Sequence, residues 1–129
     1  MFRISRLMQK VLLTALSVVA LSACGTVGDS SAVKDANNLA IACETDEALL
    51  AVDRAAKSGG LSGSIADLQR VVILRDAGRL SEADAAMADR NARAGADAQA
   101  ATEAERAVSE SLEELRSARH KETGRRVCP

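Results

Sequence analysis

The first 23 residues constrain this chain most, because they decide which residues remain to fold. Arg3, Arg6 and Lys10 form a basic start, and an uncharged run rich in Leu, Val and Ala follows from 11 to 23. A positive start, a short apolar run and small residues at its end are typical of a secretory signal. The run is also shorter than the roughly 20 apolar residues that a spanning helix needs. Residues 1–23 are therefore predicted to be a signal peptide.

The signal ends in Leu21-Ser22-Ala23-Cys24, which resembles the lipobox of bacterial lipoproteins. The resemblance implies that Cys24 becomes the first residue of the mature chain and carries a diacylglycerol on its sulfur. Two or more acyl chains anchor a protein stably at a membrane without crossing it. Gly25 is not the aspartate that favours inner-membrane retention in many lipoproteins, so the resemblance implies the outer membrane, facing the periplasm. An ordinary signal peptide with an incidental cysteine is the alternative.

The composition of residues 24–129 excludes some classes of function. All 18 acidic residues and 14 of the 17 basic ones lie there, so the mature net charge is −4 with His120 neutral. A nucleic-acid-binding surface needs a basic stripe, so we expect no nucleic-acid partner. The one aromatic residue, Phe2, leaves with the signal peptide, which excludes aromatic platforms that stack on bases or sugars. Alanine is the commonest residue and the strongest helix former, so we expect helices around a thin core.

Two cysteines remain once Cys24 carries the lipid. Cys43 and Cys128 form an even pair in an oxidising compartment, which favours a disulfide. Closing a loop of about 85 residues is worth about 4–5 kcal/mol in the chain-entropy model. Free buried thiols, a catalytic cysteine and a metal site are the alternatives. The metal site lacks ligands, because the chain has one histidine and no Cys-x-x-Cys motif, and we expect no metal or cofactor.

Residues 24–36 are predicted to be the lipidated cysteine and a flexible tether, because Gly25, Gly28 and two adjacent serines favour coil. A helical domain is expected from 37 to 129. Whether 37–42 already belong to a first helix is left open by the pattern.

Signals for helices recur from Thr45 onward. Thr45 is predicted to cap a helix that ends at Ser58-Gly59-Gly60, and Gly78 is predicted to stop the next one. Ser64 and Ser81, each followed by aspartate three residues later, have the spacing of a capping box and are predicted to open the second and third helices. No segment alternates as a strand does, so the expected fold is all-α.

The end of the third helix has two interpretations. Its apolar residues continue in phase beyond Gly95, so one helix over 81–121 competes with a turn at Gly95 and a fourth helix from about 97 to 121. In an up-down bundle of three to four helices, the last helix brings Cys128 back toward Cys43. A continuous helix, about 60 Å long, would carry it away. An intramolecular disulfide therefore predicts a turn at Gly95.

Residues 73–83 resemble the centre of a tetratricopeptide repeat. The residues that match the family's pattern are Leu74, Gly78, Glu82, Ala83 and Met87. Val71 and Arg90 stand where the family has small residues, and no second copy follows 34 residues later, although stacked repeats need about three units. The resemblance implies a helical hairpin with a peptide-binding role. A generic pair of helices with a glycine turn is the alternative.

The residues that could carry chemistry lack the arrangements that catalysis needs. His120 lies near a helix end between Arg119 and Lys121, without a serine and an acid to orient it, so we expect it to be solvated. Glu113 and Glu114 are adjacent on a helix and do not face each other. We therefore expect a protein that is not an enzyme.

The sequence predicts a lipid-anchored envelope protein that acts as a small helical scaffold or adaptor and binds a protein partner. The alternatives are an inhibitor or immunity factor against a periplasmic hydrolase and, less favoured, a small hydrolase. Val108, Leu112 and Leu115 share one face of the last helix among Ala, Ser and Glu, and are predicted to meet a partner or a second copy of the chain. Packing in the chain's own core is the competing interpretation.

Overall fold

The computed structural model describes residues 24–129, with side chains from Ser31 onward, and the predicted signal peptide lies outside the described residues. The described part of the chain is all-α and contains no strand. Its five helices are α2 (Cys24–Ile41), α3 (Thr45–Ala56), α4 (Gly60–Asp76), α5 (Leu80–Ala94) and α6 (Ala98–Thr123). The predicted fold class is therefore confirmed.

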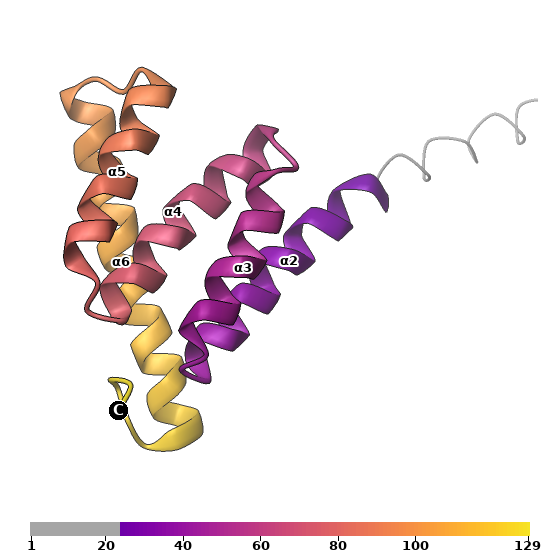
Figure 1. Ribbon diagram of the computed structural model, residues 1–129, viewed down its shortest axis with the longest axis vertical. Coiled ribbons are helices and arrows are strands. Elements are labelled where there is room, and N and C mark those ends of the chain that lie inside the picture. The colour runs from indigo at the N-terminus through magenta and orange to yellow at the C-terminus, as the bar shows by residue number, and fades with distance from the viewer. Residues whose placement is uncertain (1–23) are drawn as a thin grey trace, which may run out of the picture.

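Successive helices run in alternating directions and form an up-down bundle (Figure 1). The start of α2, the α3–α4 turn and the α5–α6 turn lie at one end of the bundle, which we call the upper end. The α2–α3 turn, the α4–α5 turn and the C-terminal residues lie at the opposite, lower end. Every connection is three residues long. Helices α3, α4 and α5 each pack on the helix before them, whereas α6 packs on α4 and α2.

The flexible tether predicted for residues 24–36 is wrong, because α2 covers this whole range. Packing explains the difference. Ala36 and Ala40 are 0% and 2% exposed, and α2 packs along α3 and against α4 and α6. Small side chains allow close approach of two helices, and tertiary contacts of this kind outweigh the weak helix propensity of glycine and serine. The bundle consequently has five described helices, not three to four.

The centre of the bundle is α4, which contacts all four other described helices. Four consecutive residues near its end are buried, namely Val71, Val72, Ile73 and Leu74. Consecutive positions on a helix point in all directions, so this burial requires neighbours on every side. The most apolar stretch of residues 24–129 therefore forms the central helix.

Glycine ends the helices where the sequence predicted. Gly78 and Gly95 have φ values of 73° and 60°, in the left-handed region that glycine adopts easily. The amide of Arg79 donates to the carbonyl of Leu74, and the amide of Ala96 donates to that of Asn91, as in Schellman turns. The turn at Gly95 separates α5 from α6, which excludes the single long helix.

The predicted helix starts are only partly right. Asp97 caps α6, and its carboxylate accepts a hydrogen bond of 2.8 Å from the amide of Ala100. Thr45, Ser64 and Ser81 do not cap their helices: α3 begins at Thr45 itself, and α4 and α5 begin four residues and one residue earlier than the predicted serine caps. In the α2–α3 and α4–α5 turns, the residue with positive φ is followed directly by Glu44 or Arg79. The carbonyl of that residue already accepts the first hydrogen bond of the next helix, so no position remains for a separate cap.

Candidate functional site

The predicted lipidation site, Cys24, is the first residue of α2, at the upper end of the bundle (Figure 1). Its modification stays a prediction from the lipobox resemblance. The chain direction nevertheless sets where an anchor on Cys24 would act: at the end of the bundle opposite the C-terminal residues.

The two other cysteines meet at the lower end. The Sγ atoms of Cys43 and Cys128 lie 2.08 Å apart, at the distance of a disulfide, across a sequence separation of 85. Cys43 lies in the α2–α3 turn and Cys128 in the segment that follows α6. The bond therefore fastens the C-terminal segment to the first described helical hairpin, which is the pairing that the sequence predicted.

Cys43 occupies an unusual backbone conformation for its residue type. Its φ is 64°, and it is the only non-glycine residue in the described range with a positive φ. The amide of Cys43 donates to the carbonyl of Ala40, and that of Glu44 donates to Leu39, so Cys43 takes the place that glycine holds in a Schellman turn. A side chain here costs about 1–2 kcal/mol. The disulfide requires that side chain, which explains why glycine is absent from this one turn.

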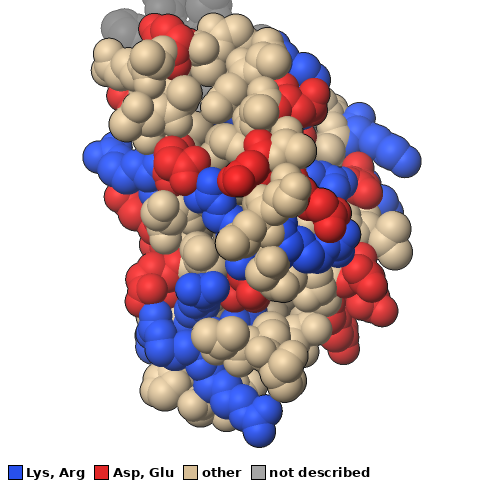
Figure 2. Space-filling view, turned by 60° about the vertical axis from the view of Figure 1, so that its left-hand side comes forward, with Lys and Arg blue, Asp and Glu red and all other residues tan. Residues whose placement is uncertain are grey.

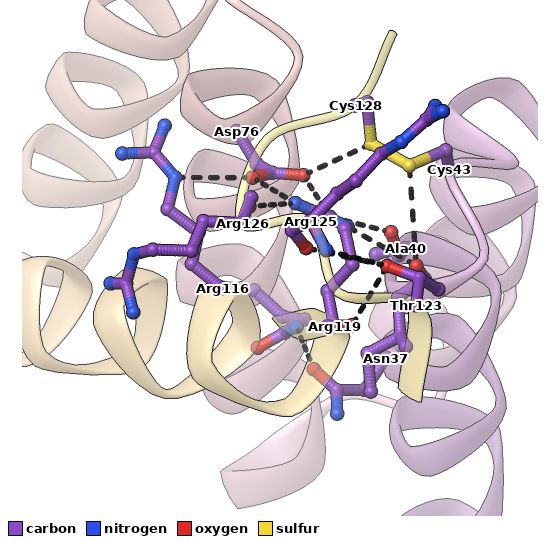
Figure 3. Close-up of polar contacts among 12 residues, drawn as sticks. Asn37, Ala40, Cys43, Asp76, Arg116, Arg119, Thr123, Arg125, Arg126 and Cys128 are labelled. Carbon is purple, nitrogen blue, oxygen red and sulfur yellow. Dashed lines mark hydrogen bonds and ion pairs between the residues drawn. A yellow bond between two sulfur atoms is a disulfide. The ribbon is translucent and has the colours of Figure 1, made fainter. Parts of the chain in front are cut away.

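Beside the disulfide, the guanidinium of Arg119 is almost fully buried, with its side chain 1% exposed (Figure 3). Its Nε donates to the carbonyl of Ile41 at 3.1 Å, and Nη2 donates to that of Ala40 at 2.7 Å. Nη1 donates to the carbonyl of Arg126 at 2.7 Å. The two remaining N–H groups meet the carboxylate of Asp76 at 3.0 and 2.5 Å. All five donors of the side chain are thus used.

Each of these contacts joins a different part of the fold. The carbonyls of Ala40 and Ile41 belong to the last turn of α2, where carbonyls lack the regular helical hydrogen bond. That of Ala40 also accepts from the amide of Cys43. Asp76 ends α4, and Arg126 belongs to the C-terminal segment. Arg119 on α6 therefore holds α2, α4 and the C-terminal segment together. We call Asp76, Arg119, Cys43 and Cys128 the lower-end cluster.

Asp76 is held from two sides. Its carboxylate, 4% exposed, pairs with Arg119 and also accepts a hydrogen bond of 3.3 Å from Nε of Arg116. Its Oδ2 lies 3.9 Å from the sulfur of Cys128. A buried carboxylate is tolerated only when it is paired and hydrogen-bonded, as here. No buried side-chain nitrogen or oxygen in the described part of the chain lacks a hydrogen-bond partner.

Two hollows flank the C-terminal segment. One, of about 390 Å³, is lined by Thr45, Arg75 and Arg116 next to the disulfide, and the other, of about 300 Å³, by Thr123 and Arg125 next to Arg119. The cations of the first already have partners, because Arg116 contacts Asp76, and Arg75 pairs with Glu105 on α6 and Asp84 on α5. The hydrogen bond from Arg75 lowers the pKa of the Glu105 carboxyl group below its usual range. These groups hold helices together.

The other candidates for chemistry lie apart from these hollows. His120 is exposed in the last turn of α6, as expected. Within residues 24–129, no three His, Cys, Asp or Glu side chains are grouped as metal ligands would be. The disulfide occupies the sulfur of Cys43, so neither a free thiol nor a thiolate nucleophile is present at that position.

The predicted partner surface on α6 is wrong. Val108 and Leu115 are 0% and 2% exposed and belong to the core, and Leu112 is half-buried against it. Helix α6 packs against α4 and α2, and its apolar face belongs to the core that these helices share. The competing interpretation, core packing, is the correct one.

Arg119 and Asp76 are the residues that the sequence patterns did not single out. A signal for Arg119 exists: it follows Leu115 by four residues, on the face that also carries Val108 and Leu112. A charged residue that continues an apolar face must either reach solvent or find a buried partner. Asp76, directly after the most apolar stretch of α4, is the corresponding signal on the other helix.

Charges of both signs cover the surface. On the face shown in Figure 2, basic and acidic side chains are interspersed, and the lowest charged groups are basic. Many of them form pairs between helices, such as Arg70 with Asp53 and Arg93 with Asp67. No helix within residues 24–129 is both long enough and apolar enough to span a bilayer.

No family model matches this sequence, and no curated protein or solved structure shows significant similarity to it.

Proposed function

We propose that this chain is a lipoprotein of the bacterial envelope, anchored through Cys24, that acts as a small helical adaptor and presents its lower end to a protein partner. The observation that carries the proposal is the polarity of the bundle. Cys24 begins the first described helix at the upper end, whereas the lower-end cluster stiffens the end that points away from it. By the lipobox resemblance, the membrane is the outer membrane and the bundle faces the periplasm.

The chemistry of the lower-end cluster supports binding. Arg119 directs all five donors to the chain's own carbonyls and to Asp76, and the disulfide is adjacent. These bonds fix the backbone of three segments relative to one another. A surface that is already rigid loses little conformational entropy when a partner binds, which favours affinity.

The lower end also offers apolar contacts. Leu80 at the start of α5 and Val127 in the C-terminal segment are 60% and 57% exposed. Burial of an exposed apolar side chain against a partner favours binding in proportion to the apolar area removed from water. These two side chains are the proposed contacts for the partner.

Crosslinking in intact cells, followed by purification of the tagged chain from the envelope, tests the proposal. We expect one envelope protein in a fixed ratio, and Val127→Asp should reduce its recovery. Leu50→Asp is the matched control, because Leu50, in the middle of α3, is 59% exposed and is not one of the two proposed contacts. A recovered hydrolase in inactive form would make the chain an inhibitor or immunity factor. Turnover by the purified chain without a partner would make it an enzyme and refute the proposal.

A further inference from the structure

The most exposed large apolar side chain in the described range lies at the upper end of the bundle. Leu61, in the first turn of α4, is 78% exposed, and Ile65 is 46% exposed. Positions four apart share one face of a helix, so the two side chains are neighbours on the surface. They lie next to the α3–α4 turn and do not belong to the core cluster.

The same turn is basic in a chain that is acidic overall. Residues 54–66 contain Arg54 and Lys57 and no acid. Both side chains are exposed, and neither has an ion-pair partner within the described residues. The flanking acids, Asp53 and Asp67, are already paired with arginines. The α3–α4 turn therefore combines two free cations with two exposed apolar side chains. We call Arg54, Lys57, Leu61 and Ile65 the upper tip.

The upper tip lies at the end of the bundle where α2 begins (Figure 1). Helix α2 has 18 residues and α3, antiparallel to it, has 12, with a three-residue turn between them. The end of α3 thus lies about six residues short of Cys24, about 9 Å along the helix axis. An interfacial side chain reaches about 5–10 Å into the boundary between headgroups and acyl chains. A small tilt of α2 brings the upper tip to that boundary.

We infer that the upper tip contacts the anionic lipid surface in which the acyl chains of Cys24 are embedded. Leu61 and Ile65 enter the interface, and Arg54 and Lys57 meet the headgroup phosphates. This second contact holds the bundle in one orientation, with its lower end away from the membrane. The inference rests on the proposed lipid anchor, and adds to it the surface that lies on the membrane.

The three lysines of the mature chain, Lys34, Lys57 and Lys121, allow a direct test. The purified lipidated protein is placed in vesicles of phosphatidylethanolamine and phosphatidylglycerol, or in detergent, and treated with a membrane-impermeant acylating reagent. Mass spectrometry follows each lysine. We expect acylation of Lys57 to be slower in the vesicles by about fivefold or more, the factor for one cation held near an anionic surface. Lys121, exposed at the lower end, should react equally in both.

Two matched variants separate the upper tip from surface charge in general. Leu61→Asp and Leu80→Asp each replace an exposed leucine in the first turn of a helix, where an acid suits the helix dipole. Both should therefore fold. We expect Leu61→Asp to restore the acylation of Lys57 in vesicles to its rate in detergent, and Leu80→Asp to leave the protection intact.

The outcomes distinguish this inference from the proposed anchor. Protein that lacks an acyl mass on Cys24 refutes the anchor. Protein that carries the acyl mass, yet shows Lys57 equally reactive in vesicles and detergent, refutes the membrane contact and leaves the anchor standing. Protection of Lys57 in detergent that increases with protein concentration would assign the upper tip to a second copy of the chain and overturn the inference.

Discussion

Replacing Arg119 by methionine removes the charge at the centre of the lower-end cluster and keeps much of the side-chain volume. Asp76, whose side chain is 4% exposed, would keep only the contact with Arg116 at 3.3 Å. The carbonyl oxygens of Ile41 and Arg126 would lose the donor that Arg119 supplies, and that of Ala40 would keep only the amide of Cys43. Removing one partner of a buried ion pair costs about 3–5 kcal/mol. That is a large share of the 5–15 kcal/mol typical of a small domain.

Urea unfolding followed by circular dichroism measures the effect, on the Cys24→Ser chain with its disulfide intact. We expect Arg119→Met and Asp76→Leu each to lower the free energy of unfolding by about 3 kcal/mol or more. The double variant should lower the free energy of unfolding by less than the sum of the two single losses, because it leaves neither buried charge of this pair without its partner. Arg106→Met is the control on the same helix, since Arg106 is 74% exposed and, among residues 24–129, forms an ion pair with Glu110 alone. Arg106→Met should change the free energy of unfolding by no more than about 0.5 kcal/mol. An Arg119→Met loss below about 1 kcal/mol, or strict additivity, would refute the reasoning.

Four further outcomes follow from the structure and the sequence. Cys24→Ser should yield a chain without an acyl mass, uncleaved or cut elsewhere, and a wild-type chain that starts at another residue without that mass would contradict the lipobox. Cys128→Ser should destabilise the fold by up to about 4–5 kcal/mol, measured by thermal unfolding, and speed hydrogen exchange first at the end of α6. Glu105→Gln should cost at most about 1 kcal/mol at pH 7, because the carboxylate is half exposed. The lowered pKa of Glu105 means that this difference shrinks as the pH falls below about 4.3, which pH-dependent unfolding measures. Leu115→Asp should abolish cooperative unfolding in the monomer, and preserved stability would contradict its place in the core.

Where helices end was predictable from the sequence, and where they begin was less so. The backbone at Gly78 and Gly95 has a positive φ, which residues other than glycine adopt only at a cost in free energy. A glycine at these positions therefore marks the end of a helix in the sequence itself. Serine and threonine caps are only preferences, and the tight Schellman turns left no separate residue for them. Two residues separate Gly95 from α6, whereas one residue separates Gly78 from α5. The additional residue, Asp97, is free to act as a cap, and it does so.

Long-range packing explains the remaining differences. The composition of residues 24–36 favours coil, and nothing local shows that Ala36 will be buried against α3 and α4. The face of α6 that carries Leu115 looked isolated because its partner, α4, lies some 40 residues earlier in the chain. The pairing of Arg119 with Asp76 likewise joins two helices whose contact no periodicity reveals.

The disulfide also decides how the molecule bears a mechanical load. If Cys24 is fixed to a membrane and a partner pulls on the C-terminal segment, tension runs along α2 to Cys43 and then directly through the covalent bond to Cys128. Residues 44–127 lie inside the covalent loop and are bypassed. Only one helix then lies in the path of the force, and its last carbonyls are held by Arg119. Tension that would otherwise unfold helices α3 to α6 one after another is borne by α2 and the disulfide alone.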